Sequence, residues 1–252
     1  MIPNPIRRVL SSIEKRNVRA LLMGGQACVL YGAAEFSRDT DLAVLASAAN
    51  LERLRRALDD LRARVIAVPR FQARYLRRGH AVHFRCHDPE ALDMRIDVMT
   101  RMRGLEPFPK LWARRTSLEL PDRTRCEVMS LPDLVQAKKT QRDKDWPMVR
   151  RLIEAHYFRH RDRATAAQVS FWLRELRTPE LLVESARRWP AAWASQKRRR
   201  VLLALARPGQ EPALAEALAR EEWIERRADA QYWRPLKGEL ERLRHARLRG
   251  RA

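Results

Sequence analysis

The chain has 252 residues and a formal net charge of +21, with 52 Lys and Arg against 31 Asp and Glu. That length suits one large domain or two modest ones, and a hydrophobic content of 45% is too high for a disordered chain. No apolar run approaches the roughly 18 residues of a membrane-spanning helix, and residues 1–8 lack the apolar stretch of a secretory signal, so we expect a cytoplasmic protein with no membrane partner.

Up to about residue 160 the hydrophobic pattern mixes helices with short strands. Apolar residues at helical spacing predict helices, at 5–16, 26–32, 51–65, 133–141 and 145–158. Short apolar or alternating runs predict strands, at 18–23, 40–45, 65–68, 81–86, 94–99, 117–120 and 126–130. The sequence therefore predicts an α+β domain over residues 1–160.

From about residue 163 the strand patterns disappear, and Ala, Leu, Arg and Glu dominate. Helices are expected at 164–176, 179–188, 191–206, 211–227 and 236–249. Five tryptophans of this part are expected to fill helix–helix contacts, namely Trp172, Trp189, Trp193, Trp223 and Trp233. Residues 161–252 are thus predicted to form a basic, all-helical C-terminal domain.

The stretch from Leu21 to Val44 combines a glycine turn with two close carboxylates. Gly24 and Gly25 follow a buried strand and precede a short helix, so the backbone can approach a ligand closely and free N–H groups can face an anion. Asp39 and Asp41 stand two residues apart at the start of the strand expected at 40–45, and in a strand such residues share one face. Two such carboxylates repel each other unless a cation lies between them, and Mg²⁺ bound by two carboxylates and substrate phosphates is a common arrangement.

The order of strand, Gly-Gly, short helix, hydroxyl-x-Asp-x-Asp and apolar strand resembles the nucleotidyltransferase superfamily. More narrowly, it is similar to the bacterial minimal nucleotidyltransferases that include abortive-infection (AbiEii-type) toxins. The resemblance covers about residues 18–157. It implies a nucleotidyltransferase-like mixed sheet with flanking helices. It also implies an enzyme that moves a nucleoside monophosphate from a nucleoside triphosphate (NTP) to an acceptor hydroxyl with Mg²⁺ or Mn²⁺.

Two later segments match the same family pattern. Asp97, on the strand expected at 94–99, matches a third carboxylate, although Asp93 and Arg95 would share its face and Asp93 competes for the role. The segment from Asp133 to Lys138 matches a distal helix whose lysine can offer a point charge to a nucleotide phosphate.

The resemblance assigns roles to seven residues. Metal binding and catalysis are expected of Asp39, Asp41 and Asp97. Nucleotide binding is expected of Gly24, Gly25, Ser37 and Lys138. One departure is Gln26, because many relatives have a hydroxyl residue directly after the first glycine or glycines. That departure keeps open an alternative, a catalytically inactive nucleotidyltransferase-like protein that binds nucleotide or RNA.

The remaining expectations concern partners. The charge of +21 attracts polyanions, although 45 of the 52 basic residues are arginine, a skew that a GC-rich genome also produces. The family resemblance allows RNA or tRNA, a protein or a small molecule as acceptor, and an antitoxin protein as partner in a toxin–antitoxin or phage-defence system. A purely basic RNA- or DNA-binding protein is the third reading, without a recognisable nucleic-acid-binding signature. Structural or surface roles are expected for His80, His83 and His87, and Cys28, Cys86 and Cys126 have no metal-ligand spacing.

Overall fold

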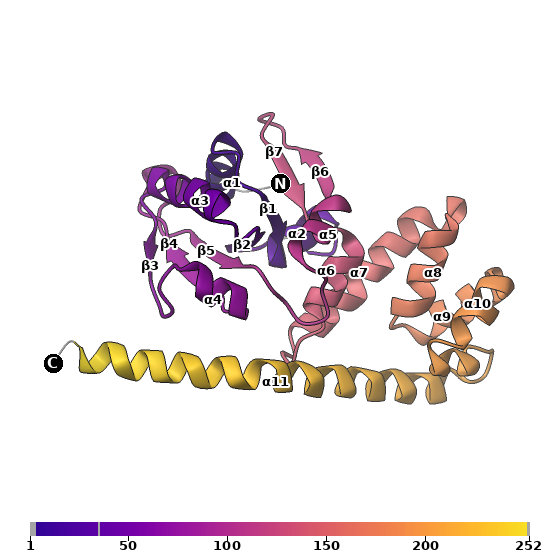
Figure 1. Ribbon diagram of the computed structural model, residues 1–252. Helices are drawn as coiled ribbons and strands as arrows, with labels where there is room; N and C mark the ends of the chain where they lie inside the picture. The colour runs from indigo at the N-terminus through magenta and orange to yellow at the C-terminus, as the bar shows by residue number, and fades with distance from the viewer. Residues whose placement is uncertain (1–3, 35, 251–252) are drawn as a thin grey trace. The chain divides into compact units, whose positions relative to one another are not determined.

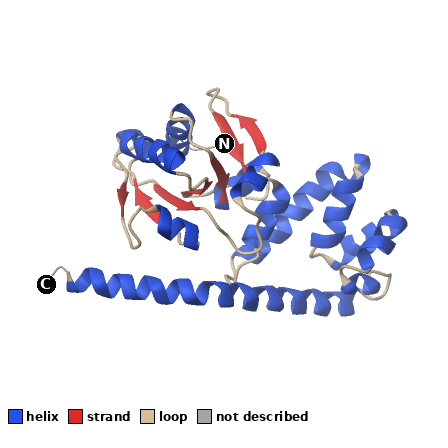
Figure 2. Ribbon diagram, viewed as in Figure 1, coloured by secondary structure: helices blue, strands red, loops and turns tan. Residues whose placement is uncertain are grey.

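The computed structural model of the chain describes residues 4–34 and 36–250 (Figures 1 and 2). The fold class is α+β, as the sequence predicts: a mixed β-sheet with flanking helices is followed by a helical region. The chain forms two compact units. The sheet unit contains the chain up to Leu30, then Ala34–Ala137, and the segment that begins at Gln231; the helical unit contains Tyr31–Ala33 and Lys138–Ala230.

These units do not coincide with the expected domains at 1–160 and 161–252. The expected boundary follows the change in sequence character, whereas the compact units divide at 137/138 and return the end of the last helix to the sheet unit. The division into a nucleotidyltransferase-like domain over residues 1–160 and a basic helical domain over residues 161–252 stays a prediction.

Seven strands of the described residues form one sheet in the order β3-β4-β5-β2-β1-β7-β6. Their bounds are β1 Ala20–Met23, β2 Asp39–Val44, β3 Arg64–Val65, β4 Val82–Arg85, β5 Arg95–Met99, β6 Thr116–Glu119 and β7 Arg125–Val128. β2 runs parallel to β5 and β1 runs parallel to β7, whereas the other neighbours are antiparallel. The strand that carries Asp39 and Asp41 therefore lies in the middle of the sheet, where its position is fixed from both sides.

Helices of the sheet unit are α1 Asn4–Lys15, α2 Gly24–Leu30, α3 Ala48–Asp60, α4 Ala73–Arg78 and α5 Phe108–Ala113, and α6 Leu131–Lys138 ends at the first residue of the next unit. A short 3₁₀ turn, η1, covers Pro89–Ala91. α4 and α5 are not expected from the sequence, because six-residue helices are too short to show a helical period. α2 begins at Gly24 itself, two residues before its expected start.

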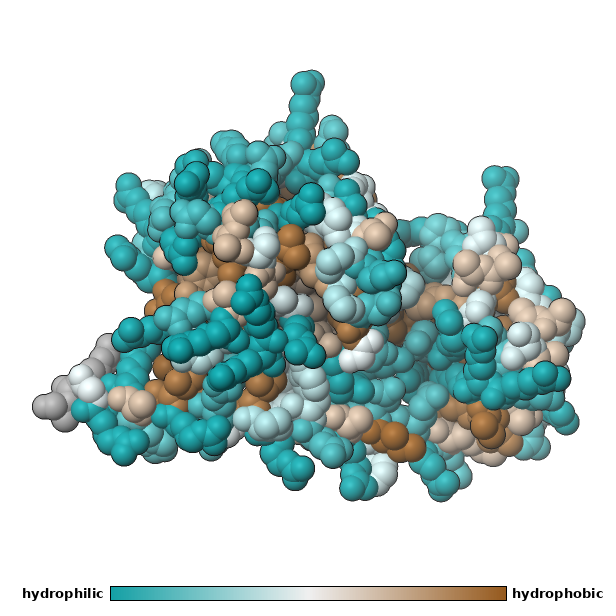
Figure 3. All heavy atoms as spheres, viewed as in Figure 1, coloured by the Kyte–Doolittle hydropathy of each residue, from teal (hydrophilic) through white to brown (hydrophobic). Residues whose placement is uncertain are grey.

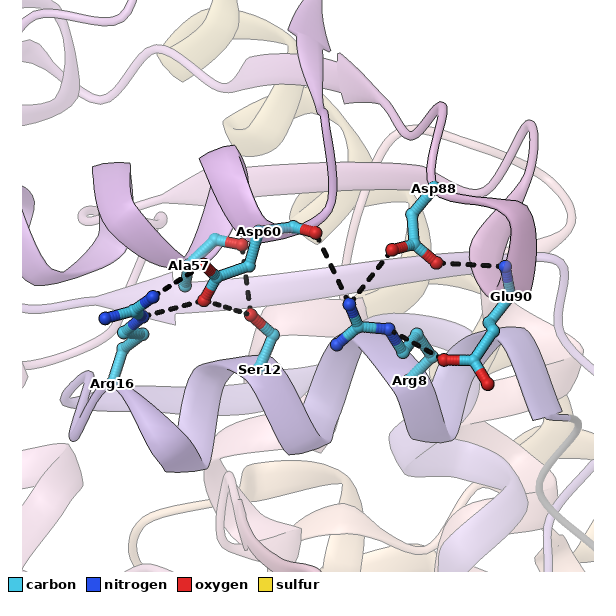
Figure 4. Close-up of polar contacts among 7 residues, drawn as sticks. All are labelled: Arg8, Ser12, Arg16, Ala57, Asp60, Asp88 and Glu90. Atoms are coloured by element: carbon cyan, nitrogen blue, oxygen red, sulfur yellow. Dashed lines mark hydrogen bonds and ion pairs between the residues drawn. The ribbon is translucent and has the colours of Figure 1, made fainter.

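Helix α1 is held by polar contacts along one of its faces (Figure 4). Arg16 makes two short contacts with Asp60 at the end of α3, at 2.6 and 2.7 Å, and Ser12 donates to the Ala57 carbonyl at 3.0 Å. One turn earlier Arg8 pairs with Asp88 at 2.9 Å, at the start of η1. These contacts supplement the burial of Ile6, Val9, Leu10 and Ile13 on the same helix.

We expect the free energy of unfolding of the sheet unit to fall at acidic pH. The hydrogen bond from Arg8 holds the pKa of Asp88 below its ordinary value of 3.8, although burial opposes this. A carboxyl with a lowered folded-state pKa contributes stability that is complete above the unfolded value and is lost as the pH falls through 3.8 towards the folded value. When the pH is lowered from 5 to 3, the free energy of unfolding of Arg8→Gln should therefore fall by about 1 kcal/mol less than that of the unchanged chain, as measured by urea unfolding. An equal fall in both proteins would contradict the role of Arg8 in lowering the pKa of Asp88.

The helical unit packs around Trp172. Its elements are α7 Asp145–His160, η2 Arg161–Arg163, α8 Ala166–Glu175, α9 Pro179–Arg188, α10 Pro190–Lys197, η3 Val201–Leu205 and the first part of α11 Glu211–Arg249. Trp172 is fully buried, and its ring centroid lies 5.0 Å from that of Tyr157 and 5.5 Å from that of Trp189. A core role is therefore correct for Trp172 but wrong for Trp223, which is 54% exposed on α11.

The helix expected at 191–206 is interrupted because Arg200 turns into the interior. The chain leaves helical geometry there, with an Arg200 φ of −127°. The buried guanidinium donates to the carbonyls of Leu173 and Leu176 at 3.0 Å and lies 2.8 Å from Glu221 on α11. The carbonyls at the end of α8 thus receive their hydrogen bonds from Arg200, and these contacts compensate for the interruption of the helix expected at 191–206.

The break expected between residues 227 and 236 is wrong, because α11 runs through Pro235 without ending. Proline removes one helical hydrogen bond and crowds the preceding turn, at a cost of about 3 kcal/mol. Contacts within the sheet unit hold the helix after this point: Leu236 is buried beside Gly79, and Glu239 lies 2.8 Å from the buried ring of His80. Tertiary packing therefore outweighs the local preference of the proline.

The surface fits a strongly basic, water-exposed chain. The face shown in Figure 3 is largely hydrophilic, with apolar residues scattered among polar ones. Within residues 4–34 and 36–250, none of the helices has the length and apolar character needed to cross a membrane. The described cysteines Cys28, Cys86 and Cys126 are all buried, and none forms a disulfide.

Candidate functional site

Four charged side chains share one face of the two central parallel strands. β2 and β5 pair so that Asp39 lies opposite Arg95 and Asp41 lies opposite Asp97. Directly paired residues of adjacent strands point to the same face, and so do residues two apart. The residues between them, Thr40 and Ile96, are buried on the other face. We call Asp39, Asp41, Arg95 and Asp97 the carboxylate array.

The glycine turn lies against this array at Asp41. Met23, the last residue of β1, pairs with Asp41, so Gly24 follows directly beside it. Gly24 has a φ of +67°, and a Cβ at this position would overlap the Asp41 carboxylate. Both the left-handed backbone and the close approach of the carboxylate therefore require glycine. The structure thus brings together the turn and the carboxylate, which the sequence places 17 residues apart.

The second glycine of the turn lies against Ser37. A Cβ at Gly25 would come 2.6 Å from the Ser37 hydroxyl oxygen, which in this structure donates to the Asp39 carbonyl at 3.3 Å. Gln26 lies on the buried side of α2 and is only 1% exposed, and its side-chain amide makes no hydrogen bond within the described protein atoms. The hydroxyl that Gln26 does not provide is therefore present at the turn, on Ser37.

Asp97 is held by two neighbours, Arg95 and His83. Arg95 donates to both carboxylate oxygens, from Nε at 2.8 Å and from Nη2 at 3.0 Å. His83 on β4 pairs with Asp97 across the sheet, and its Nδ1 lies 2.8 Å from Oδ1. Burial raises the pKa of Asp97, but the hydrogen bonds of His83 and Arg95 outweigh it and the net pKa lies below the ordinary value. The same Nδ1 also lies 3.1 Å from Arg95 Nη2, so His83, Arg95 and Asp97 form one cluster of polar contacts.

Asp93, the competitor for the third carboxylate, is not part of this array. It precedes β5, is exposed, and has a φ of +59°, which places it in a turn rather than on the strand. The alternation of faces therefore does not extend to Asp93, and Asp97 is the residue aligned with Asp41.

Lys138 belongs to the helical unit, where its ammonium group lies 3.2 Å from Asp145. Asp145 is buried and also accepts from Arg142 at 2.7 Å. Burial raises the pKa of Asp145, but the charge of Lys138 and further contacts lower it below its ordinary value. In the described structure Lys138 thus neutralises a buried carboxylate, and its contact with a phosphate stays a prediction.

Asp133, the first residue of the distal motif, has a structural environment. It is buried, Arg114 of the segment after α5 donates to both of its oxygens at 2.7 Å, and Ser130 donates to it at 2.6 Å. The hydrogen bond to Asp133 raises the pKa of Arg114 further above its ordinary value. Asp133 therefore fixes the start of α6 to α5 and does not extend the carboxylate array.

Two residues of the site were assigned no role from the sequence, His83 and Arg95. His83 was expected to be structural or on the surface, yet it contacts the carboxylate array. The available signal was spacing: His83 and Arg85 alternate with buried Val82 and Phe84, which places the polar pair on one face of a strand. That spacing cannot reveal which strand lies alongside.

The array offers hard oxygen ligands, the type that Mg²⁺ and Mn²⁺ prefer. Within residues 4–34 and 36–250, however, no three or more His, Cys, Asp or Glu side chains converge on one point as a metal cluster. Asp39 and Asp41 suit a divalent cation shared with substrate phosphates, whereas both oxygens of Asp97 already accept from Arg95. The donor set therefore fits a metal at Asp39 and Asp41.

No family model matches this chain, and no curated protein is detectably similar to it. The resemblance to nucleotidyltransferases accordingly depends on the motif residues of the sequence and stays a prediction.

Proposed function

We propose that this chain is a metal-dependent nucleotidyltransferase that transfers a nucleoside monophosphate from an NTP to an acceptor hydroxyl. The observation that carries the proposal is the close approach of the Asp41 carboxylate to Gly24, the first glycine of the Gly24-Gly25 turn. A phosphate-binding turn and a metal-binding carboxylate must lie side by side in such an enzyme, because metal and phosphate share oxygen ligands.

Each residue of the site has a part in this proposal. Asp39 and Asp41 would hold Mg²⁺ or Mn²⁺, which supplies positive charge to the triphosphate when bound. Backbone N–H groups at Gly24 and Gly25, with the Ser37 hydroxyl, would orient the phosphates. The acceptor oxygen forms a bond to the α-phosphorus, the bond from that phosphorus to the pyrophosphate oxygen breaks so that pyrophosphate leaves, and the acceptor proton passes to water. Asp97 lies on the same face and is the third carboxylate of the motif.

We further propose RNA as the acceptor, because the net charge of +21 attracts a polyanion. Phosphate contacts make such binding steeply dependent on salt, so RNA retention should fall sharply between about 50 and 200 mM NaCl. A protein or small-molecule acceptor would instead show weak dependence on salt.

The decisive test is incubation of the full chain with each α-³²P-labelled NTP, Mg²⁺ and either total cellular RNA or total cellular protein. Label in the RNA fraction, lost on omission of Mg²⁺, supports the proposal as a whole. Label in the protein fraction supports nucleotide transfer and overturns the choice of RNA. NTP binding without any transfer would instead favour the inactive, nucleotide-binding alternative.

Ser37→Ala should raise the KM for NTP by about tenfold and change kcat less, because one hydrogen bond to a charged phosphate is removed from a site whose carboxylates remain. Steady-state transfer kinetics measure the two parameters separately. Ser195→Ala, at an exposed serine of α10, is the control and should leave both unchanged. An unaltered KM in Ser37→Ala would remove Ser37 from the phosphate site.

A further inference from the structure

Arg95 is the one basic member of the carboxylate array, and it lies between its acidic members. It stands opposite Asp39 on the neighbouring strand and two residues before Asp97 on its own strand. Its two hydrogen bonds to Asp97, at 2.8 and 3.0 Å, occupy both oxygens of that carboxylate. A second metal ion bound by Asp97 would need the same two oxygens that the Arg95 guanidinium occupies.

The contact between Arg95 and Asp97 lies among further polar and charged groups, namely His83 and the other two aspartates of the array. Asp97 is 15% exposed at its side chain, and His83 on β4 places its Nδ1 2.8 Å from Asp97 Oδ1. The hydrogen bond to Asp97 raises the pKa of Arg95; burial opposes this, and the charges of Asp97, Asp39 and Asp41 add to it. Arg95 therefore experiences the field of all three aspartates, although it is bonded to one of them.

The charge of Arg95 is directed at one carboxylate of the array, because its two hydrogen bonds both go to Asp97. Arg95 also cannot lose its charge by deprotonation at ordinary pH.

We propose that Arg95 serves as a built-in cation for Asp97, so that the carboxylate array binds one divalent metal ion, at Asp39 and Asp41, rather than two. This inference rests on the proposed function, since it concerns the same metal site. Arg95 thereby becomes a positioning residue that sets the metal stoichiometry of the site, and Asp97 acts through its hydrogen bonds instead of as a metal ligand.

The test is direct counting of Mn²⁺ bound to the full chain without nucleotide, from the electron paramagnetic resonance signal of free Mn²⁺. We expect one Mn²⁺ per chain, and a loss of affinity of about tenfold or more in Asp41→Asn. Arg95→Gln should bind a second Mn²⁺, since Asp97 becomes available. Arg95→Lys keeps the positive charge and should bind one. The double variant Arg95→Gln with Asp97→Asn should also return to one.

Two Mn²⁺ ions bound by the unchanged chain, or a single ion in a folded Arg95→Gln variant, would overturn the inference. The count for the unchanged chain decides the matter even if Arg95→Gln does not fold. Transfer assays separate the two proposals. Nucleotide transfer with two bound ions would leave the proposed function standing without the inference, and one ion at Asp39 and Asp41 without transfer would do the reverse.

Discussion

Replacing Asp41 with asparagine is expected to lower nucleotide transfer by about a thousandfold or more, because the substitution removes a negative charge that the proposed function assigns to holding the metal beside the phosphates. Asparagine is close to aspartate in shape, and Gly24 leaves the space that either side chain needs. Thermal unfolding of Asp41→Asn should therefore match that of the unchanged chain. Initial rates of label incorporation measure the loss.

Asp93→Asn is the matched control for this experiment. It makes the same chemical change at an exposed turn just before β5, outside the carboxylate array, and it should leave transfer unaltered. Equal losses in both variants would indicate a general effect of charge. Undiminished transfer by Asp41→Asn would remove the carboxylate array from the reaction.

Replacing Trp172 with alanine is expected to destabilise the helical unit by about 3–5 kcal/mol, the range for removal of a large buried aromatic side chain. Trp172 is fully buried between Tyr157 and Trp189, so little of the space it fills can collapse without moving α7 and α9. Its Nε1 also donates to His156 Nδ1 at 2.9 Å. Burial lowers the pKa of His156 to about 4, which keeps that acceptor nitrogen neutral.

Urea unfolding followed by tryptophan fluorescence and circular dichroism measures this effect. The matched control is Trp223→Ala, since it removes the same side chain from an exposed site on α11. The control should change stability by no more than about 0.5 kcal/mol. Comparable losses in the two variants would contradict the core position of Trp172.

The carboxylate array shows which parts of a site the sequence can predict. Two aspartates separated by one residue must share a face once the segment is a strand, so the pairing of Asp39 with Asp41 follows from local geometry. The alignment of Asp41 with Asp97 does not, because the parallel strands β2 and β5 are joined by the long connection 45–94, whose path the local sequence does not fix. Arg95 shares a face with Asp97 by the same local rule, whereas its position opposite Asp39 follows only from the register of β2 and β5.

The glycine turn was predictable as a close approach, but what approaches it was not. Gly24 and Gly25 indicate that something lies near the backbone. Only the fold identifies Asp41 and Ser37 as the two side chains concerned. For this reason the absence of a hydroxyl residue at Gln26 is a clear departure from the motif in the sequence but a smaller one in the structure, because Ser37 supplies a hydroxyl at the same turn.

Helix α11 is a case in which a local sequence rule predicts a break that does not occur. Pro235 predicts an end to the helix, and the helix continues because its later turns bury Leu236 and pair Glu239 with His80. The sequence does not predict the short helices α4 and α5 for a related reason. Six residues are too few to show a helical hydrophobic period, so the conformation depends on packing against the rest of the fold.

The division of α11 between the two units bears on the order of events during synthesis. The sheet unit receives its last segment only after Gln231, whereas the helical unit is complete at Ala230. During synthesis the described strands of the sheet therefore leave the ribosome well before Glu239, the partner of the buried His80. The surroundings of His80 are accordingly completed by a segment that is made late in synthesis, and a product that stops before residue 231 leaves that histidine without the Glu239 carboxylate.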